Sequence, residues 1–270
     1  MAFSVLLSLY YKENPEYLRQ SLDSVFSQTL RPDEVILVED GPLTPELNAV
    51  LDESEKKYPE LYRVKLPENG GLGKALNEGL KYCSYDLVIR TDTDDICFPD
   101  RFEKQVSFMD NHPDISASSG WIVEFEGNTD NRISIKKVPE DNDEIIKYGS
   151  YRNPMNHPAT IFRKKDVEEV GGYKHFPLFE DWFLWARLMA KGYKLCNLQS
   201  PLLYFRTSPD MYKRRGGIKY AYDSFRFQLM LHKLGLITYL HAFKAGILRG
   251  TVYIMPNFIR KSIYQNILRR

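Results

Sequence analysis

The alternation of short apolar runs with amphipathic stretches over residues 3–95 constrains the fold most strongly. The apolar runs predict buried strands at Phe3–Leu9, 34–38, 62–66 and Leu87–Arg90. The stretches between them predict helices at 14–26, 45–58 and Leu72–Tyr82. Strands separated by helices of this length form parallel sheets with helices on both faces. We therefore expect an α/β fold, a three-layer sandwich around a mainly parallel sheet.

Three of the expected strands are followed by residues that suit ligand binding. Glu39-Asp40 follows the second strand, the Gly-rich segment 69–71 follows the third, and 92–95 follows the fourth. Ligands of open parallel sheets bind at the carboxyl ends of the strands, near the point where the strand order reverses. The candidate ligand-binding residues thus lie at the end of the sheet where such folds have their binding crevice.

The segment Asp92-Thr93-Asp94-Asp95 is the first candidate site. Carboxylates this close repel one another, and a divalent cation such as Mg²⁺ or Mn²⁺ relieves the repulsion. Both ions also bridge phosphate oxygens, and Arg90 is placed to contact the same phosphates. The alternative is a solvated acidic turn, or an N-cap for a helix over 99–111.

The other candidates are individually ambiguous. Segment 69–74, which includes Lys74, either offers helix-start amides to phosphate or ribose oxygens or forms a flexible turn. It matches neither the dinucleotide fingerprint nor the P-loop. Glu180 and Asp181 either cap a helix or include a general base. His157 either lines the pocket or is structural, and we favour the structural role.

Beyond residue 100 the pattern becomes α+β. We expect helices at 99–111 and 181–191, one or two strands at 115–125, a polar loop at 126–143, a strand at 202–206, and a helical segment after Gly217. The three cysteines have no zinc or disulfide spacing, which favours reduced thiols. The apolar stretch 236–243 is interrupted by polar residues, so we expect no membrane-spanning helix.

Charge divides the chain at about residue 212. Residues 212–270 carry twelve Lys or Arg and one acid, a formal charge of +11 against −10 for residues 1–211. Apolar and basic residues after Pro256 recur at helical spacing, which favours an anionic membrane over packing on the acidic body. Arg214 and Arg215 belong either to a mobile basic loop that folds over the diphosphate or to a loop that is only solvated. No nucleic-acid-binding fold is recognisable.

Taken together, these motifs resemble the inverting family-two glycosyltransferases of the GT-A fold. The resemblance covers roughly residues 3–206 and depends on order and spacing. It is carried by Ser4–Ser8 with Tyr10, by 21–29, by Val38-Glu39-Asp40-Gly41, by 69–79, by 90–102 and by Glu180-Asp181-Trp182. It implies a GT-A domain over 1–211, with a donor half at about 1–100 and an acceptor half at about 101–211. A basic helical extension at 212–270, expected to associate with a membrane, follows.

The resemblance also implies roles for particular residues. It implies that Asp94 coordinates the cation, with Asp92 on the ribose side, and that Asp181 is the catalytic base. The expected nucleotide-sugar contacts are Ser8, Tyr10, Glu39, Asp40, Asn69, Gly71, Lys74, Arg90, Asp92 and Thr93. The expected acceptor or loop contacts are His157, Glu180, Trp182, Arg214 and Arg215. Many relatives carry a histidine after the segment 204–206, where this chain has Thr207-Ser208, so the ligand set there is open.

The implied activity is a metal-dependent, inverting transfer of a hexose or N-acetylhexosamine from a UDP-sugar to an acceptor hydroxyl. We expect a saccharide acceptor on polyprenyl diphosphate, as in bacterial O-antigen, lipopolysaccharide or capsule synthesis. The expected location is the cytoplasmic face of the cell membrane, with the protein held peripherally. Two alternatives stay open: a nucleotidyltransferase that makes sugar nucleotides, and an inactive membrane-bound scaffold of the same fold.

Overall fold

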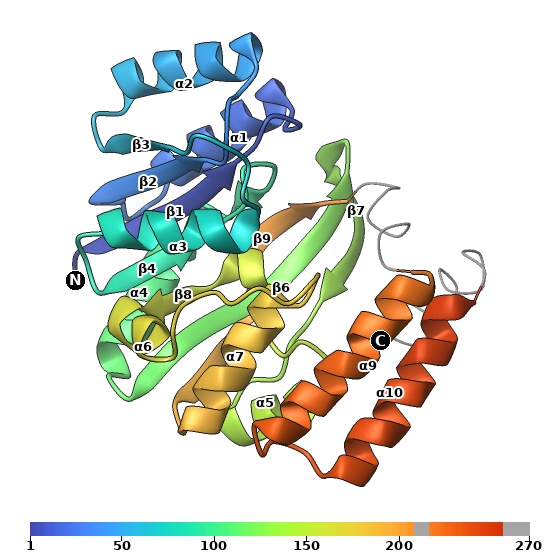
Figure 1. Ribbon diagram of the computed structural model, residues 1–270. Helices are drawn as coiled ribbons and strands as arrows, with labels where there is room; N and C mark the ends of the chain where they lie inside the picture. The colour runs from blue at the N-terminus through green and yellow to red at the C-terminus, as the bar shows by residue number, and fades with distance from the viewer. Residues whose placement is uncertain (208–215, 256–270) are drawn as a thin grey trace.

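The computed structural model describes residues 1–207 and 216–255 of the chain (Figure 1). Its strands are β1 (Phe3–Leu9), β2 (Glu34–Glu39), β3 (Leu61–Lys65), β4 (Leu87–Arg90), β5 (Ile96–Cys97), β6 (Ile115–Glu126), β7 (Asn128–Lys136), β8 (Ile161–Arg163) and β9 (Lys194–Arg206). Together they form one sheet in the order β3-β2-β1-β4-β8-β6-β9-β5, with β7 paired to β6.

The sheet is parallel where the sequence predicts it. β1 pairs in parallel with both β2 and β4, and β2 pairs in parallel with β3. Every residue of β2 and β4 is buried, as expected for strands covered on both faces. Beyond β4 the sheet becomes mixed, because β8 runs antiparallel to β4 and to β6.

Helices cover both faces of the sheet, which confirms the three-layer arrangement. They are α1 (Pro15–Phe26), α2 (Pro45–Lys57), α3 (Leu72–Tyr82), α4 (Arg101–Asn111), α5 (Asn142–Gly149), η1 (His157–Ala159), α6 (Lys164–Glu169), α7 (Glu180–Lys191), α9 (Ile218–Lys233) and α10 (Tyr239–Ile254). Side chains of β1 alternate between two cores. Leu6 belongs to the core that also contains residues of α3, α7 and α9, whereas Val5 and Leu7 belong to the core that contains residues of α1, α2 and α4.

Two elements differ from the sequence-based expectation. Most of the loop expected at 126–143 is a strand, because β7 covers Asn128–Lys136 and pairs antiparallel with β6 across Gly127. β7 is mostly exposed, so its polar residues give little hydrophobic signal for a strand. The strand expected at 202–206 begins at Lys194, and register shifts opposite Gly120 and Trp121 break its alternation of apolar and polar residues.

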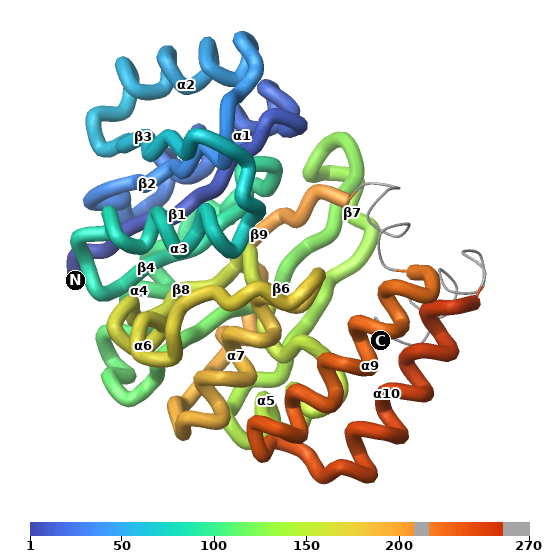
Figure 2. Tube along the Cα trace, viewed as in Figure 1, coloured from blue at the N-terminus to red at the C-terminus, as the bar shows by residue number. Residues whose placement is uncertain are grey.

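The helices after residue 216 pack against the body of the protein. α9 and α10 form an antiparallel hairpin beside α7, orange to red in Figure 2. Phe227 of α9 is fully buried, and its ring lies 5.0 Å from Phe179 and 4.7 Å from Trp182 between centroids. The described part of the basic region, residues 216–255, therefore shares the core of the body. The amphipathic helix expected after Pro256 lies outside the described residues.

The packing of α9 generates a stability prediction. Phe227→Ala should lower the free energy of unfolding by about 3–5 kcal/mol, because it opens a cavity among the four aromatic rings that surround Phe227. Tyr222→Ala, on the exposed side of the same helix, is the matched control and should cost far less. Urea unfolding followed by circular dichroism measures both. Equal effects of the two substitutions would mean that α9 is only loosely attached.

Candidate active site

The carboxyl ends of β1, β2 and β4 meet at one edge of the sheet, as the sequence predicts. The amide of Asp40, after β2, donates to the carbonyl of Leu9 at 2.7 Å. The hydroxyl of Ser21 on α1 donates to the carbonyl of Asp92, after β4, at 2.9 Å. Ser8 and Tyr10 lie at the same edge, with Ser8 half-buried and Tyr10 exposed. This edge is the candidate active site.

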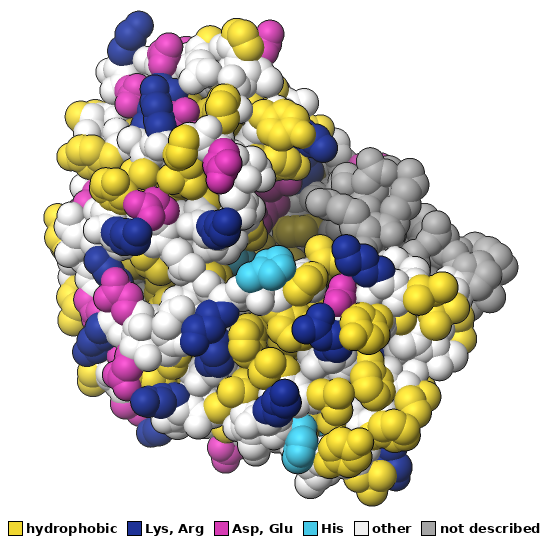
Figure 3. All heavy atoms as spheres, in the orientation of Figure 1, with side chains coloured by type: hydrophobic (Ala, Val, Ile, Leu, Met, Phe, Trp, Pro, Cys, Tyr) yellow, Lys and Arg dark blue, Asp and Glu magenta, His cyan; other side chains and the backbone are white. Residues whose placement is uncertain are grey.

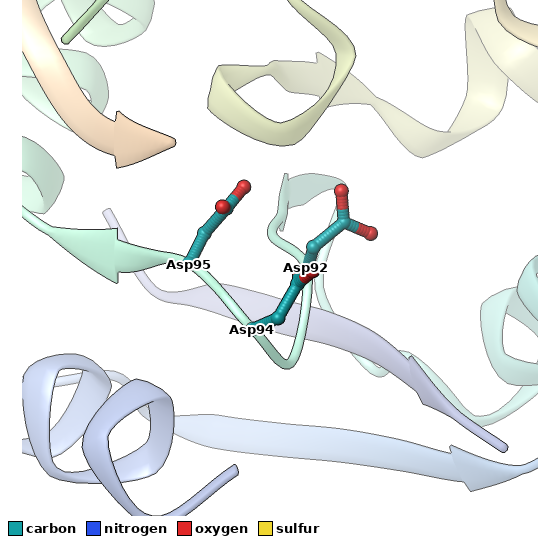
Figure 4. Close-up of side chains that lie close together, drawn as sticks. All are labelled: Asp92, Asp94 and Asp95. Atoms are coloured by element: carbon teal, nitrogen blue, oxygen red, sulfur yellow. The ribbon is translucent and has the colours of Figure 1, made fainter. Parts of the chain in front are cut away.

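Asp92, Asp94 and Asp95 form a compact group of carboxylates on the turn after β4. One oxygen from each lies within 4.8 Å of the others. Figure 4 shows the three side chains on this short turn, with Asp92 and Asp95 pointing to the same side. Arg90 is buried and bonds both oxygens of Asp92, one of them at 2.9 Å. Arg90 therefore fixes the orientation of Asp92.

The environment of this turn disfavours charge on Asp94 and Asp95. Burial, with Asp92 and then Glu13 nearby, raises the pKa of Asp94 from 3.8 to about 7. Burial and the neighbouring carboxylates also raise the pKa of Asp95 well above its usual value. Asp95 accepts the amide of Arg206 on Oδ1, while its buried Oδ2 has no partner among the described residues. Clustered hard oxygens with an unused lone pair fit a divalent cation such as Mn²⁺ or Mg²⁺.

Two buried arginines hold the backbone of the turn. Arg206 Nε donates to the carbonyl of Asp94 at 2.9 Å, and its guanidinium lies over the Tyr17 ring at 3.9 Å. Arg101 donates to the carbonyl of Arg90 at 2.8 Å. Because these bonds go to carbonyl groups, they fix the turn without occupying the carboxylates. No pattern in the sequence links Arg206 to this turn, because more than a hundred residues separate the two.

Asp40 anchors the Gly-rich turn. Its two carboxylate oxygens accept the amides of Gly70 at 2.7 Å and Gly71 at 3.0 Å. Asn69 adds a bond from its side-chain amide to the Asp40 carbonyl at 3.1 Å. A Cβ on Gly41 would lie 2.6 Å from the amide nitrogen of Asn69, so only glycine permits this approach. These two amides are therefore engaged by Asp40, whereas we expected the segment to offer its amides to phosphate.

Two residues expected to contact the nucleotide have structural partners instead. Glu39 is buried and accepts Arg63 Nε at 2.6 Å, which ties β2 to β3. The hydroxyl of buried Thr93 donates to Glu13 at 3.2 Å. We therefore leave both out of the proposed binding surface. Lys74 is exposed at the start of α3, with its stem over Gly70.

Glu13 is an acid at the site that the sequence analysis missed. Burial raises its pKa, and Asp92 raises it further. Its Oε1 accepts the amide of Asn14 at 2.9 Å, so the loop between β1 and α1 brings it to the acidic turn. Nothing in the sequence around Glu13 distinguishes it from other surface acids. Its position follows only from the packing of that loop.

Asp181 lies in the first turn of α7. Its Oδ2 accepts the side-chain amide of Asn153 at 2.5 Å, and its Oδ1 accepts the amide of Trp182 at 2.7 Å. The preceding Glu180 lies beside the Gly-rich turn, since a Cβ on Gly73 would be 3.7 Å from Glu180 Cγ. Burial and then the charge of Asp181 raise the pKa of Glu180. The structure thus brings the start of α7 to the start of α3.

Tyr173 and His157 lie buried between these two groups. Burial raises the pKa of Tyr173, and the charges of Asp181 and Asp92 raise it further while Arg90 opposes them. The Tyr173 hydroxyl and His157 Nε2 are 2.9 Å apart. Burial, and then Arg90, hold the pKa of His157 well below its usual value, so this imidazole is neutral. His157 is a buried structural residue, which agrees with the role we favoured.

Three of the expected acceptor or loop contacts remain: Trp182, Arg214 and Arg215. Trp182 is buried, and its indole nitrogen donates to the carbonyl of Gly149 at 3.1 Å. Its expected contact with the acceptor is therefore wrong, because the apolar face of α7 turns the ring into the core. Arg214 and Arg215 lie outside the described residues.

Comparisons of the sequence with known proteins agree on one family. A family model described as "Glycosyl transferase family 2" matches residues 4–171. An uncharacterised glycosyltransferase of Haemophilus influenzae is 44% identical over 100% of both chains. The UDP-Gal:alpha-D-GlcNAc-diphosphoundecaprenol beta-1,3-galactosyltransferase of Escherichia coli is 42% identical over 99% of this chain and 97% of its own. The amylovoran biosynthesis glycosyltransferase AmsE of Erwinia amylovora is 41% identical, over 94% and 91%.

Solved structures share the fold. TarS 1-349 of S. aureus, in complex with UDP-GlcNAc, aligns over 98% of this chain and 75% of its own with a TM-score of 0.66 and 17% identity. The mannosyltransferase PcManGT of Pyrobaculum calidifontis, in complex with GDP-Man and Mn²⁺, aligns over 96% and 78% with a TM-score of 0.64 and 17% identity. The fold is therefore that of GT-A glycosyltransferases.

The raised pKa of Asp94 generates a prediction on pH and stability. Between its unfolded pKa of 3.8 and its folded pKa of about 7, the native state binds the extra proton, so this carboxyl lowers stability as pH rises through that window. In metal-free protein, Asp94→Asn should match the wild-type melting temperature near pH 5 and exceed it by a few degrees near pH 8.

Thermal unfolding in EDTA at the two pH values measures this difference. Asp100→Asn, at an exposed carboxyl paired with Lys104, is the matched control and should show no such gain. Added Mn²⁺ should raise the melting temperature of wild type near pH 8 and leave Asp94→Asn unchanged. A difference between Asp94→Asn and wild type that is the same at both pH values would contradict the burial of this charge.

Proposed function

This chain belongs to glycosyl transferase family 2, and we propose that it transfers a hexose or N-acetylhexosamine from a UDP-sugar to a saccharide hydroxyl with inversion. The observation that carries this proposal is the placement of two groups. The carboxylates at 92–95 and the Asp181 carboxylate both lie near the buried Tyr173, because burial raises the pKa of Tyr173 and the charges of Asp181 and Asp92 raise it further. One group suits a diphosphate with its cation, and the other suits a base for the acceptor hydroxyl.

The relatives support the choice of substrates. The Escherichia coli enzyme is named for a UDP-Gal donor and a GlcNAc-diphosphoundecaprenol acceptor, and it matches nearly the whole chain. The Erwinia enzyme is named for the synthesis of the polysaccharide amylovoran. We therefore propose a lipid-diphosphate-linked acceptor and a role in bacterial surface polysaccharide synthesis, such as O-antigen or capsule. For the donor sugar, we propose a hexose or an N-acetylhexosamine and do not choose between them.

The acidic turn is proposed to hold the donor diphosphate. Asp94 and Asp92 would bind Mn²⁺ or Mg²⁺, and such an ion, when bound, offsets negative charge that develops on the leaving diphosphate. Arg90 orients Asp92 through its two bonds, so we give it a positioning role. Ser8, Tyr10 and the turn anchored by Asp40 are proposed to contact the nucleoside, since they line the same edge.

Asp181 is proposed to remove the proton from the acceptor hydroxyl. The bonds from Asn153 and the Trp182 amide hold both carboxylate oxygens in place, and each oxygen keeps a further lone pair that can accept a proton. The activated oxygen then attacks the anomeric carbon from the face opposite the diphosphate, and the bond to the diphosphate breaks. A single displacement of this kind inverts the anomeric configuration.

Family membership removes the nucleotidyltransferase alternative. The scaffold alternative is weakened because Asp92, Asp94 and Asp181 are all present and all lie at one site. The described residues contain no helix that is long and apolar enough to cross a membrane. We propose that the enzyme works at the cytoplasmic face of the membrane, where a lipid-linked acceptor is presented.

A substitution at Asp181 tests the proposal. Asp181→Asn should bind UDP with nearly wild-type affinity and should lower transfer by about 10²–10⁴-fold, the usual contribution of a general base. UDP release with a GlcNAc-diphospholipid acceptor measures transfer, and calorimetry measures binding. Glu169→Gln, at an exposed acid that pairs with Lys191 at the far end of α7, is the control and should keep wild-type activity. Undiminished turnover of Asp181→Asn would remove the base assignment.

A further inference from the structure

The hairpin of α9 and α10 exposes an apolar face. Six large apolar side chains of α10 are between 43% and 69% exposed, and they recur at helical spacing: Tyr239, Leu240, Phe243, Ile247, Leu248 and Ile254. Figure 3 shows hydrophobic side chains gathered over this hairpin at the lower right of the molecule. A row of this kind is unusual for a face that meets only water.

The opposite side of α10 packs against α9, so the protein itself leaves the apolar row uncovered. Ala242, Ala245 and Gly246 are buried against α9. A Cβ on Gly246 would lie 2.4 Å from the Phe225 ring, so glycine permits the close approach of the two helices. The small residues of α10 thus face the protein, and its large apolar residues face outward.

The charges around this face are almost all basic. Lys244 lies within the apolar row, and Lys219, Arg226 and Lys233 are exposed on α9. Residues 218–254 contain a single acid, Asp223, which is buried and 3.8 Å from Arg226. An apolar row on a hairpin that carries exposed bases and no exposed acid of its own matches the surface of an anionic bilayer, with its apolar interior and negative headgroups.

We propose that this α10 row, flanked by the bases of α9, is the surface by which the protein rests on an anionic membrane. The alternative occupant is a second copy of the chain. A two-fold dimer through this face would bring each Lys244 and the bases of α9 toward their counterparts, and like charges in apposition oppose such a dimer. The bilayer complements both the apolar residues and the charges.

The membrane surface is joined directly to the acceptor side of the site. Arg249 of α10 lies over the Trp182 ring at 5.1 Å, donates to Tyr253 Oη at 2.7 Å, and also bonds the carbonyl of Tyr151. Trp182 follows Asp181 in the chain. This part of the inference rests on the proposed function: a protein seated on α10 holds its base close to the bilayer that carries the acceptor.

Vesicle flotation with the full-length protein tests the surface. Wild type should float with vesicles of phosphatidylcholine and phosphatidylglycerol, and less with phosphatidylcholine alone. The double variant Leu240→Gln with Leu248→Gln should partition at least about tenfold more weakly. Tyr62→Gln with Tyr82→Gln removes two exposed apolar side chains elsewhere and should float like wild type. No donor or acceptor is present, so this result is independent of the transfer reaction.

Two outcomes would overturn the proposal. Full flotation of the double variant would assign membrane binding to another part of the chain. A wild-type dimer that fails to float, and that the double variant converts to a monomer by light scattering, would assign the row to a second copy. In a parallel assay, the double variant should keep its turnover on a short-chain, water-soluble acceptor and lose turnover on the same headgroup in vesicles. Loss on both acceptors would contradict the separation of docking from catalysis.

Discussion

Mutual repulsion among the carboxylates of Asp92, Asp94 and Asp95 is the constraint on which the site is built. Charges this close and this buried destabilise the fold unless neighbouring groups hold them in place. Arg90 donates hydrogen bonds to the carboxylate of Asp92. Arg101 and Arg206 donate hydrogen bonds to backbone carbonyls of the turn. The arrangement leaves carboxylate oxygens available to a cation. Stability and ligand binding are therefore coupled at one turn.

The sequence predicts the part of this arrangement that depends on local pattern. Alternating strands and helices locate the sheet, and the carboxyl ends of β2 and β4 locate Asp40 and the acidic turn. The sequence could not supply contacts made across long separations. Arg206 reaches the turn from β9, and Glu13 reaches it from a loop whose composition is ordinary.

The sequence pattern also could not predict the direction in which individual side chains point. Glu39 and Asp40 are adjacent, yet Glu39 bonds Arg63 in a neighbouring strand while Asp40 bonds the Gly-rich turn. Trp182 and Asp181 are likewise adjacent, yet one enters the core and the other faces the site. In both pairs the motif predicts only the segment, and packing decides which partners each of its two residues takes.

A single displacement, which we propose Asp181 assists, inverts the anomeric configuration, so the configuration of the product is the direct test of this mechanism. UDP-sugars such as UDP-galactose carry an α-linked diphosphate. Proton NMR of the product made from such a donor and a GlcNAc-diphospholipid acceptor should show a β linkage, as the name of the Escherichia coli relative also states for that enzyme. An α-linked product would require retention of configuration and would contradict the mechanism.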